Sequence, residues 1–138
     1  VECNPRRCHD AACSNRRLLG QRFHRVNQAE GHLVAGEPIL AGALVLEARG
    51  EIFAESLDFA ETLAGSAEQW PSELCFLRLG DTVRHALDVS RAGSLAVLVT
   101  HSPKPNCEFQ AWLVDGRPRI GVYALCVIAQ GAVLTADY

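Results

Sequence analysis

Three cysteines, Cys3, Cys8 and Cys13, lie at five-residue spacing in the segment VECNPRRCHDAACSNRR at the start of the sequence. Thiolates with this spacing can converge on a zinc ion, which prefers Cys and His ligands in tetrahedral geometry. The sequence therefore predicts a zinc site at these residues. The remaining cysteines are scattered, which argues against a secreted disulfide scaffold. Because a structural zinc ion takes four ligands, the fourth comes from His9, from a distant residue or from a longer chain.

A second set of reactive side chains lies in the loop THSPKPNC, residues 100–107, between two apolar runs. Two prolines restrict the backbone there, so the loop is expected to be rigid. The sequence contains no glycine-rich phosphate loop, no nucleophile elbow around a serine and no HExxH pair. Nucleotide hydrolysis and hydrolytic triads are therefore disfavoured.

Composition limits the remaining possibilities. The 138 residues are 49% hydrophobic with a formal charge of −3, which fits one folded domain and excludes a largely disordered chain or a generally basic surface. The longest apolar run is far shorter than the roughly 20 residues of a membrane span. No signal pattern opens the chain, so we expect a soluble protein with no membrane partner. The candidates for contact with nucleic acid are a group of arginines near the amino terminus, although such a group is equally typical of a solvated face. They are Arg6, Arg7, Arg16, Arg17, Arg22 and Arg25.

Apolar runs punctuated by Gly, Pro and Asp place these groups on a mainly β fold with short helices, of the α+β class. Two short strands joined by a turn near Ala41–Gly42 are expected in residues 33–52, and one helix from a cap at Ser56 to about Gly65. Further strands are expected in LCFLRLG, VRHALDV and SLAVLVT. The clearest local signal is FQAWLVDGRPRIGVYAL, in which a glycine-containing turn joins two β-rich runs into a hairpin.

The run HSPKPNCEFQAWLVDGRPRIGVYALCVIAQGAVLTADY resembles the carboxyl-terminal half of a SET domain in the order and spacing of its motifs. Upstream, LVLEARGEI is similar to the family's E-Y-x-G-E strand, and ALDVSRAGSLAVLVTHS is similar to its G-N-x-A-R-F-x-N-H-S segment. ECNPRRCHDAACSNRR is similar to the associated-with-SET module of the histone H3 lysine 36 branch, which holds the absent-small-homeotic, nuclear-receptor-binding SET and Set-two proteins. The resemblance divides the chain into a Cys-rich segment, residues 1–30, and a SET domain, residues 31–138, without a post-SET segment.

The resemblance implies a β-clip fold with a pseudoknot that binds S-adenosylmethionine on one face and a substrate lysine from the other. It gives Tyr138 the catalytic hydroxyl. It also implies that Cys107 joins a second zinc where a post-SET segment exists. Four residues stand at positions that contact or flank the cofactor in the family: Gly31, His32, Thr100 and His101.

The cofactor positions depart from the family pattern. Glu30 and His32 stand where two glycines are expected, and Ala48 replaces a tyrosine. Thr100 replaces an asparagine, and Val97–Leu98 replaces an arginine and a phenylalanine. These departures put S-adenosylmethionine binding in doubt, although the scaffold motifs are retained. We therefore expect a nuclear, chromatin-associated pseudo-methyltransferase that binds protein partners or nucleosomal DNA; the alternative is an active, divergent histone lysine methyltransferase.

Overall fold

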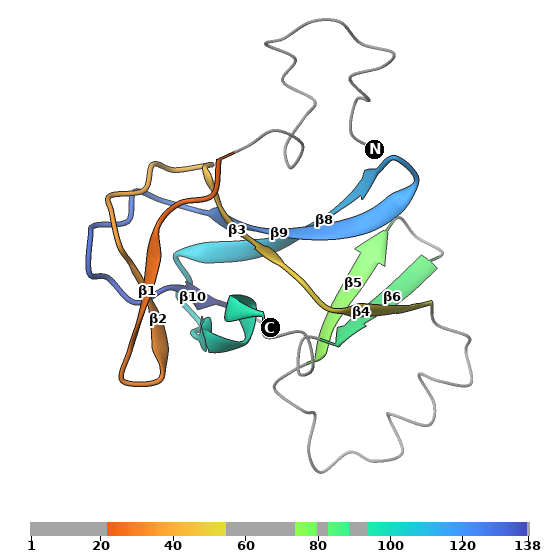
Figure 1. The fold of residues 1–138 in the computed structure, drawn as a ribbon, viewed down its shortest axis with the longest axis horizontal. Helices are drawn as coiled ribbons and strands as arrows, with labels where there is room; N and C mark the ends of the chain where they lie inside the picture. Colours follow the sequence, from red (N-terminus) through yellow and green to blue (C-terminus); the bar gives the residue numbers. More distant parts are fainter. Residues whose placement is uncertain (1–21, 55–73, 80–82, 89–93, 138) are drawn as a thin grey trace, which may run out of the picture.

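The computed structural model describes residues 22–54, 74–79, 83–88 and 94–137 (Figure 1). Three of the predictions lie outside these ranges: the zinc ligands Cys3, Cys8 and Cys13, the helix expected after Ser56 and the catalytic candidate Tyr138. Almost every described element is a strand, which confirms the predicted mainly β fold. The elements are β1 (Val26–Ala29), β2 (His32–Ala35), β3 (Leu44–Ala48), β4 (Glu51–Ala54), β5 (Leu74–Leu79), β6 (Val83–Asp88), η1 (Leu95–Leu98), β7 (Thr100–His101), β8 (Cys107–Val114), β9 (Arg117–Ala124) and β10 (Thr135–Ala136).

These strands form several small sheets. β9 lies between β3 and β8 in one three-stranded antiparallel sheet, and β6 lies between β4 and β5 in another. β1 and β2 form an antiparallel hairpin, whereas β7 and β10 pair in parallel. In Figure 1 the long β8–β9 ribbon crosses the upper part of the molecule, and the β4–β5–β6 sheet lies below its right end. Three of the candidate functional residues lie on short strands, His32 on β2 and Thr100 and His101 on β7.

The β8–β9 hairpin forms as its sequence predicts. Asp115 and Gly116 make a two-residue loop with φ angles of 51° and 75°, the left-handed conformation that Asp-Gly pairs adopt readily in such turns. Val114 pairs with Arg117 next to the loop, and the register continues without a shift to Cys107 and Ala124. The turn chemistry therefore fixes the alignment of the two longest strands.

The carboxyl-terminal segment passes between two strands that are distant in sequence. On one side, Ala35 N donates to the Ala132 carbonyl at 2.9 Å, and Leu134 N donates to the Leu33 carbonyl at 2.8 Å. On the other side, Thr100 N donates to the Leu134 carbonyl at 3.0 Å, where β7 begins its parallel pairing with β10. This threading is consistent with the knotted fold that the resemblance implies, and it brings β2, β7 and β10 together.

The core lies where the threaded segment meets the β3–β9–β8 sheet. Its largest side chains are almost fully buried, and each contributes about 1.5–3 kcal/mol relative to an exposed position. They are Leu33, Ile39, Val45, Val99, Cys107, Ile120, Val122, Ile128 and Leu134.

One predicted strand is wrong. The run SLAVLVT forms the short 3-10 helix η1, and only Thr100–His101 pairs as a strand. The Ser94 Oγ accepts from Ala96 N at 3.4 Å, and this cap starts a helical turn although the branched side chains favour strands. Within the described ranges η1 is the only helix, and no helix there is long and apolar enough to cross a membrane.

The turn predicted near Ala41–Gly42 is present, but the strands around it pair elsewhere. Ala43 N donates to the Leu40 carbonyl at 3.2 Å, and Gly42 has a φ angle of 77°. β2 before the turn pairs with β1, and β3 after it pairs with β9. The sequence does not predict β1, because VNQA is polar and shows no apolar alternation.

Candidate functional site

Gly31 and His32, two of the predicted cofactor-position residues, lie at the tip of the β1–β2 hairpin. Glu30 and Gly31 form its loop with φ angles of 52° and 82°. The left-handed conformation costs a non-glycine residue such as Glu30 about 1 kcal/mol, whereas glycine adopts it freely. A Cβ atom at Gly31 would meet nothing within 4 Å. This glycine therefore serves the turn and does not make room for a neighbouring group.

The structure joins His32 directly to Thr100. The His32 Nδ1 atom lies 2.9 Å from the Thr100 Oγ1 atom, although 68 residues separate them in the sequence. β2 positions the histidine and β7 positions the threonine, and the threaded segment holds these strands together. The side chains at two predicted cofactor positions thus hydrogen-bond to each other.

His101 lies beside Asp137 near the chain end. The His101 Nδ1 and Asp137 Oδ1 atoms are 3.9 Å apart, and the two side chains are 52% and 68% exposed. That distance is too long for a hydrogen bond that orients an imidazole for proton transfer. An exposed pair of this kind contributes about 0–1 kcal/mol, so its geometry does not mark His101 as a general base.

Asn106 ties the loop of residues 100–107 to the threaded segment. Its Nδ2 donates to the Val133 carbonyl at 2.8 Å, and its Oδ1 accepts from Thr135 N at 2.8 Å. Its backbone N–H donates to the Thr135 Oγ1 at 3.0 Å. These three hydrogen bonds fix the loop against β10, so this part of the proline-rich loop supports the scaffold.

Cys107, which the resemblance assigns to a second zinc site, is fully buried. Burial raises the pKa of its thiol to about 12, and the nearby Cys126 adds to the shift. Cys126 is exposed, and neither cysteine forms a disulfide. In the part of the chain that the structure describes, no group of three or more His, Cys, Asp or Glu side chains gathers around a common point. The described residues alone therefore do not make a metal site.

Aliphatic side chains occupy three further positions that the resemblance gives to the cofactor side of the domain. Ala48 is 5% exposed on β3 and lies opposite Ile120 of β9. Its methyl group offers no hydroxyl. Val97 and Leu98 of η1 are partly buried and pack against the core. These positions contribute contacts to the core and no polar group to a ligand.

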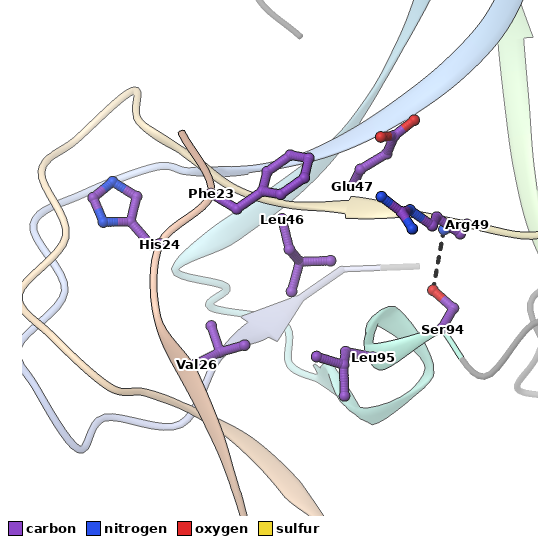
Figure 2. A pocket seen from close by; sticks show the side chains of 8 residues that line it. All are labelled: Phe23, His24, Val26, Leu46, Glu47, Arg49, Ser94 and Leu95. Atoms are coloured by element: carbon purple, nitrogen blue, oxygen red, sulfur yellow. Dashed lines mark hydrogen bonds between the residues drawn. The ribbon is translucent and has the colours of Figure 1, made fainter. Parts of the chain in front are cut away.

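A pocket of about 310 Å³ opens between the segment before β1, the end of β3 and the start of η1 (Figure 2). Leu46 is only 6% exposed, whereas Phe23 and Leu95 remain 39% and 46% exposed. The sequence does not predict this pocket, because its walls come from three separate segments and no local pattern marks them. Its lining residues are Phe23, His24, Val26, Leu46, Glu47, Arg49, Ser94 and Leu95.

Two of the three ionisable side chains that line the pocket are already paired. The Arg119 Nε donates to the Glu47 Oε1 at 2.6 Å, and the Arg119 Nη2 bonds to the other Glu47 oxygen. The His24 Nδ1 lies 3.0 Å from the Glu37 Oε1. Arg49 is exposed, and no residue in the described ranges forms an ion pair with its guanidinium. Among the described residues, the pocket therefore presents one available charge, and it is positive.

Glu37 organises the segment that enters β1. Its Oε1 accepts from Arg25 N at 3.1 Å. This backbone hydrogen bond and the contact with His24 lower the pKa of the Glu37 carboxyl below its ordinary value. The Arg22 Nη2 lies 3.6 Å from Glu37 Oε2, and the Arg25 Nε donates to the Gly36 carbonyl at 3.3 Å. These two arginines of the predicted DNA-binding group thus also make contacts within the domain.

Comparison with known proteins agrees with the motif resemblance. The family model described as SET domain matches residues 31–138. The whole chain is 32% identical to "Histone-lysine N-methyltransferase ash1" of Drosophila melanogaster over 147 residues, and 31% identical to "Histone-lysine N-methyltransferase ASHH1" of Arabidopsis thaliana over 144 residues. It is 26% identical over 144 residues to "Histone-lysine N-methyltransferase, H3 lysine-36 specific" of Cryptococcus neoformans. The chain spans 6%, 29% and 17% of the length of these relatives.

Proposed function

This chain belongs to the SET-domain family, and from that premise we propose that it is a nuclear, chromatin-associated SET module that binds partners and is impaired in methyl transfer. The names of its relatives, which are histone-lysine N-methyltransferases, support the chromatin setting. The side chains at the cofactor positions support impaired chemistry. Since the chain spans less than a third of those relatives, the proposal concerns this domain alone.

The contact between His32 and Thr100 carries the proposal. The resemblance assigns both positions to S-adenosylmethionine, with glycine leaving the backbone open at one and an asparagine amide offering polar contacts at the other. Here the imidazole and the hydroxyl lie 2.9 Å apart and bond to each other, so a ligand that needs either group must first break that bond. The residues as arranged do not fit the cofactor, and no methyl-transfer step follows from them.

Ala48 supports the same proposal at a separate position. Methyl transfer needs a neutral amine held in line with the methyl group by surrounding oxygen atoms. The resemblance places a tyrosine hydroxyl at this position. The buried methyl group of Ala48 supplies no such oxygen.

Isothermal titration calorimetry of the 138-residue chain with S-adenosylmethionine tests the proposal. We expect no binding heat at ligand concentrations up to about 1 mM. The double variant His32→Gly, Thr100→Asn restores the open turn and the amide, and we expect it to gain at least about tenfold in affinity. Thr100→Ser keeps the hydroxyl and should behave as the unmodified chain does. Micromolar binding by the unmodified chain would overturn the proposal.

An active, divergent histone lysine methyltransferase is the second candidate function. The retained Asp137–Tyr138 pair and the names of the relatives favour it. Nucleosomes incubated with the chain and S-adenosylmethionine carrying a labelled methyl group distinguish the two functions. Label transfer that disappears in Tyr138→Phe supports the enzyme, whereas no transfer above background supports the binding module.

We also propose that the amino-terminal arginines contact nucleosomal DNA.

We further propose that Cys3, Cys8 and Cys13 bind zinc. The donor types and the spacing of the cysteines support the metal. Elemental analysis should give about one zinc per chain, which is lost when the three cysteines are replaced by serine. Cys107→Ser should leave the zinc content unchanged, because no group of metal-ligating side chains gathers around Cys107 in the described part of the chain. A zinc-free chain would contradict the metal site.

A further inference from the structure

We propose that the pocket of Figure 2 binds a short peptide segment of a partner protein, which inserts one bulky apolar side chain and pairs an adjacent acidic residue with Arg49. The inference rests on the proposed role as a binding module and gives it a docking surface. The pocket shares no residue with the contact between His32 and Thr100. Its test is therefore separate from the test of cofactor binding.

The apolar part of the pocket fits one inserted side chain. Its volume of about 310 Å³ is at the lower end of the roughly 300–1,000 Å³ that hold small ligands. Figure 2 shows Phe23 and Leu95 on opposite sides of Leu46. Phe23 and Leu95 are 39% and 46% exposed. When a partner covers large apolar side chains that face water, the buried apolar surface contributes favourably to the free energy of binding.

The polar end of the pocket offers hydrogen-bond donors. Arg49 N donates to the Ser94 Oγ at 3.1 Å, so these two residues lie together (Figure 2). The Ser94 Oγ also accepts from Ala96 N at 3.4 Å, which leaves its O–H proton as the group still available for a ligand. The Arg49 guanidinium adds a charged donor. A carboxylate, which only accepts hydrogen bonds, complements both groups.

The other charged groups at the pocket do not offset Arg49. Both carboxylate oxygens of Glu47 are bonded to Arg119, and His24 is bonded to Glu37. A basic segment would therefore face Arg49, with no free carboxylate among the described lining residues to pair with. Charge complementarity selects an acidic segment over a basic one.

The exposed rim favours a peptide over a free small molecule. Small ligands bind most tightly where the protein covers most of their surface. Here Phe23 and Leu95 line the pocket and still stay 39% and 46% exposed. A peptide backbone that lies across the mouth covers both side chains while it inserts one residue.

A chemical-shift titration of the ¹⁵N-labelled 138-residue chain tests this proposal. The probe is a ten-residue Gly-Ser peptide that carries a central Phe-Asp pair. One apolar anchor with one ion pair predicts a dissociation constant of about 0.1–1 mM. The amides of Phe23, Arg49 and Leu95 should shift, and a peptide with Phe-Asn should bind about fivefold more weakly.

Two matched pairs of variants locate the contacts. Arg49→Gln should weaken binding of the Phe-Asp peptide about fivefold. It should leave binding of the Phe-Asn peptide unchanged, because that peptide has no aspartate to pair with Arg49. Arg117→Gln removes another exposed arginine, at the β8–β9 turn, and should have no effect. Leu95→Ser should weaken both peptides, whereas Leu40→Ser, at a leucine that is 70% exposed away from the pocket, should weaken neither.

Three outcomes would overturn the proposal. The first is that the pocket amides do not shift at about 2 mM Phe-Asp peptide. The second is that Arg49→Gln and the unmodified chain bind the Phe-Asp peptide equally well. The third is that phenylacetate binds as tightly as the peptide, because an aromatic ring with a carboxylate would then suffice without a peptide backbone. In each case an unchanged calorimetric result with S-adenosylmethionine leaves the impaired-chemistry proposal standing.

Discussion

The contact between His32 and Thr100 shows how two substitutions in one site can support each other. A lone imidazole at the hairpin tip would be a bulky exposed group, and a lone threonine would lack a side-chain partner at this point. Bonded at 2.9 Å, the pair links β2 to β7 and contributes about 0.5–1.5 kcal/mol. Side chains at positions that the resemblance gives to a cofactor here stabilise the strands that carry them.

Glu37→Gln should make the stability of the domain less sensitive to acid. The pKa of the Glu37 carboxyl is lowered from 4.5 because Arg25 N and His24 bond to the charged form and Arg22 lies nearby. The folded state therefore favours the ionised carboxylate. This stabilisation is complete above about pH 4.5 and is lost as the pH falls through the lowered folded pKa. Urea denaturation from about pH 7 to pH 3 should show a steeper loss in the unmodified chain than in Glu37→Gln.

Glu30→Gln is the matched control for this pH dependence. Glu30 is exposed, and no described residue hydrogen-bonds to its carboxylate. Its variant should follow the unmodified chain at every pH. Identical pH curves for Glu37→Gln and the unmodified chain would show that Glu37 does not anchor the segment before β1.

At the scale of elements, the threaded segment holds the candidate site together, and Leu134 is its central anchor. The Leu134 backbone bonds to β2 and β7 and its side chain is fully buried in the core, whereas its neighbour Val133 is 38% exposed. Leu134→Ala should lower the free energy of unfolding by about 2–5 kcal/mol, because it leaves a cavity in the core. Val133→Ala should cost less than about 1 kcal/mol. Urea denaturation measures both, and equal losses would contradict the threading.

The elements that the sequence predicted are those whose signals are local. The β8–β9 hairpin has its turn residues and its alternating strands in one continuous stretch, so it is recognised without tertiary information. β7 and β10 are two residues each, and only their mutual pairing makes them strands. For the same reason the sequence singled out His32 and Thr100 separately, but not the bond between residues 68 positions apart.

At the scale of the whole molecule, β3 contributes residues both to the pocket and to the core next to the cofactor positions. Along this strand Glu47 lines the pocket, and the next residue, Ala48, is buried in the core beside η1 and β9. Leu46 lines the pocket and belongs to the same buried cluster as Ala48, so the pocket and the core share this strand. Ala48, His32 and Thr100 do not themselves line the pocket. Under the proposed function, the residues at these three cofactor positions therefore leave the lining of the docking pocket unchanged.

Cysteine labelling should show that the threaded core opens only when the whole domain unfolds. Cys107 is fully buried and burial raises the pKa of its thiol to about 12, whereas Cys126 is exposed. In native protein near pH 7.5, iodoacetamide should modify Cys126 at least about 1,000-fold faster than Cys107, because thiolate access to Cys107 requires global unfolding. Peptide mapping by mass spectrometry gives both rates, which should converge in about 8 M urea. Similar native rates would mean that the segment around Cys107 opens locally, and the knot would then not be the most stable part of the fold.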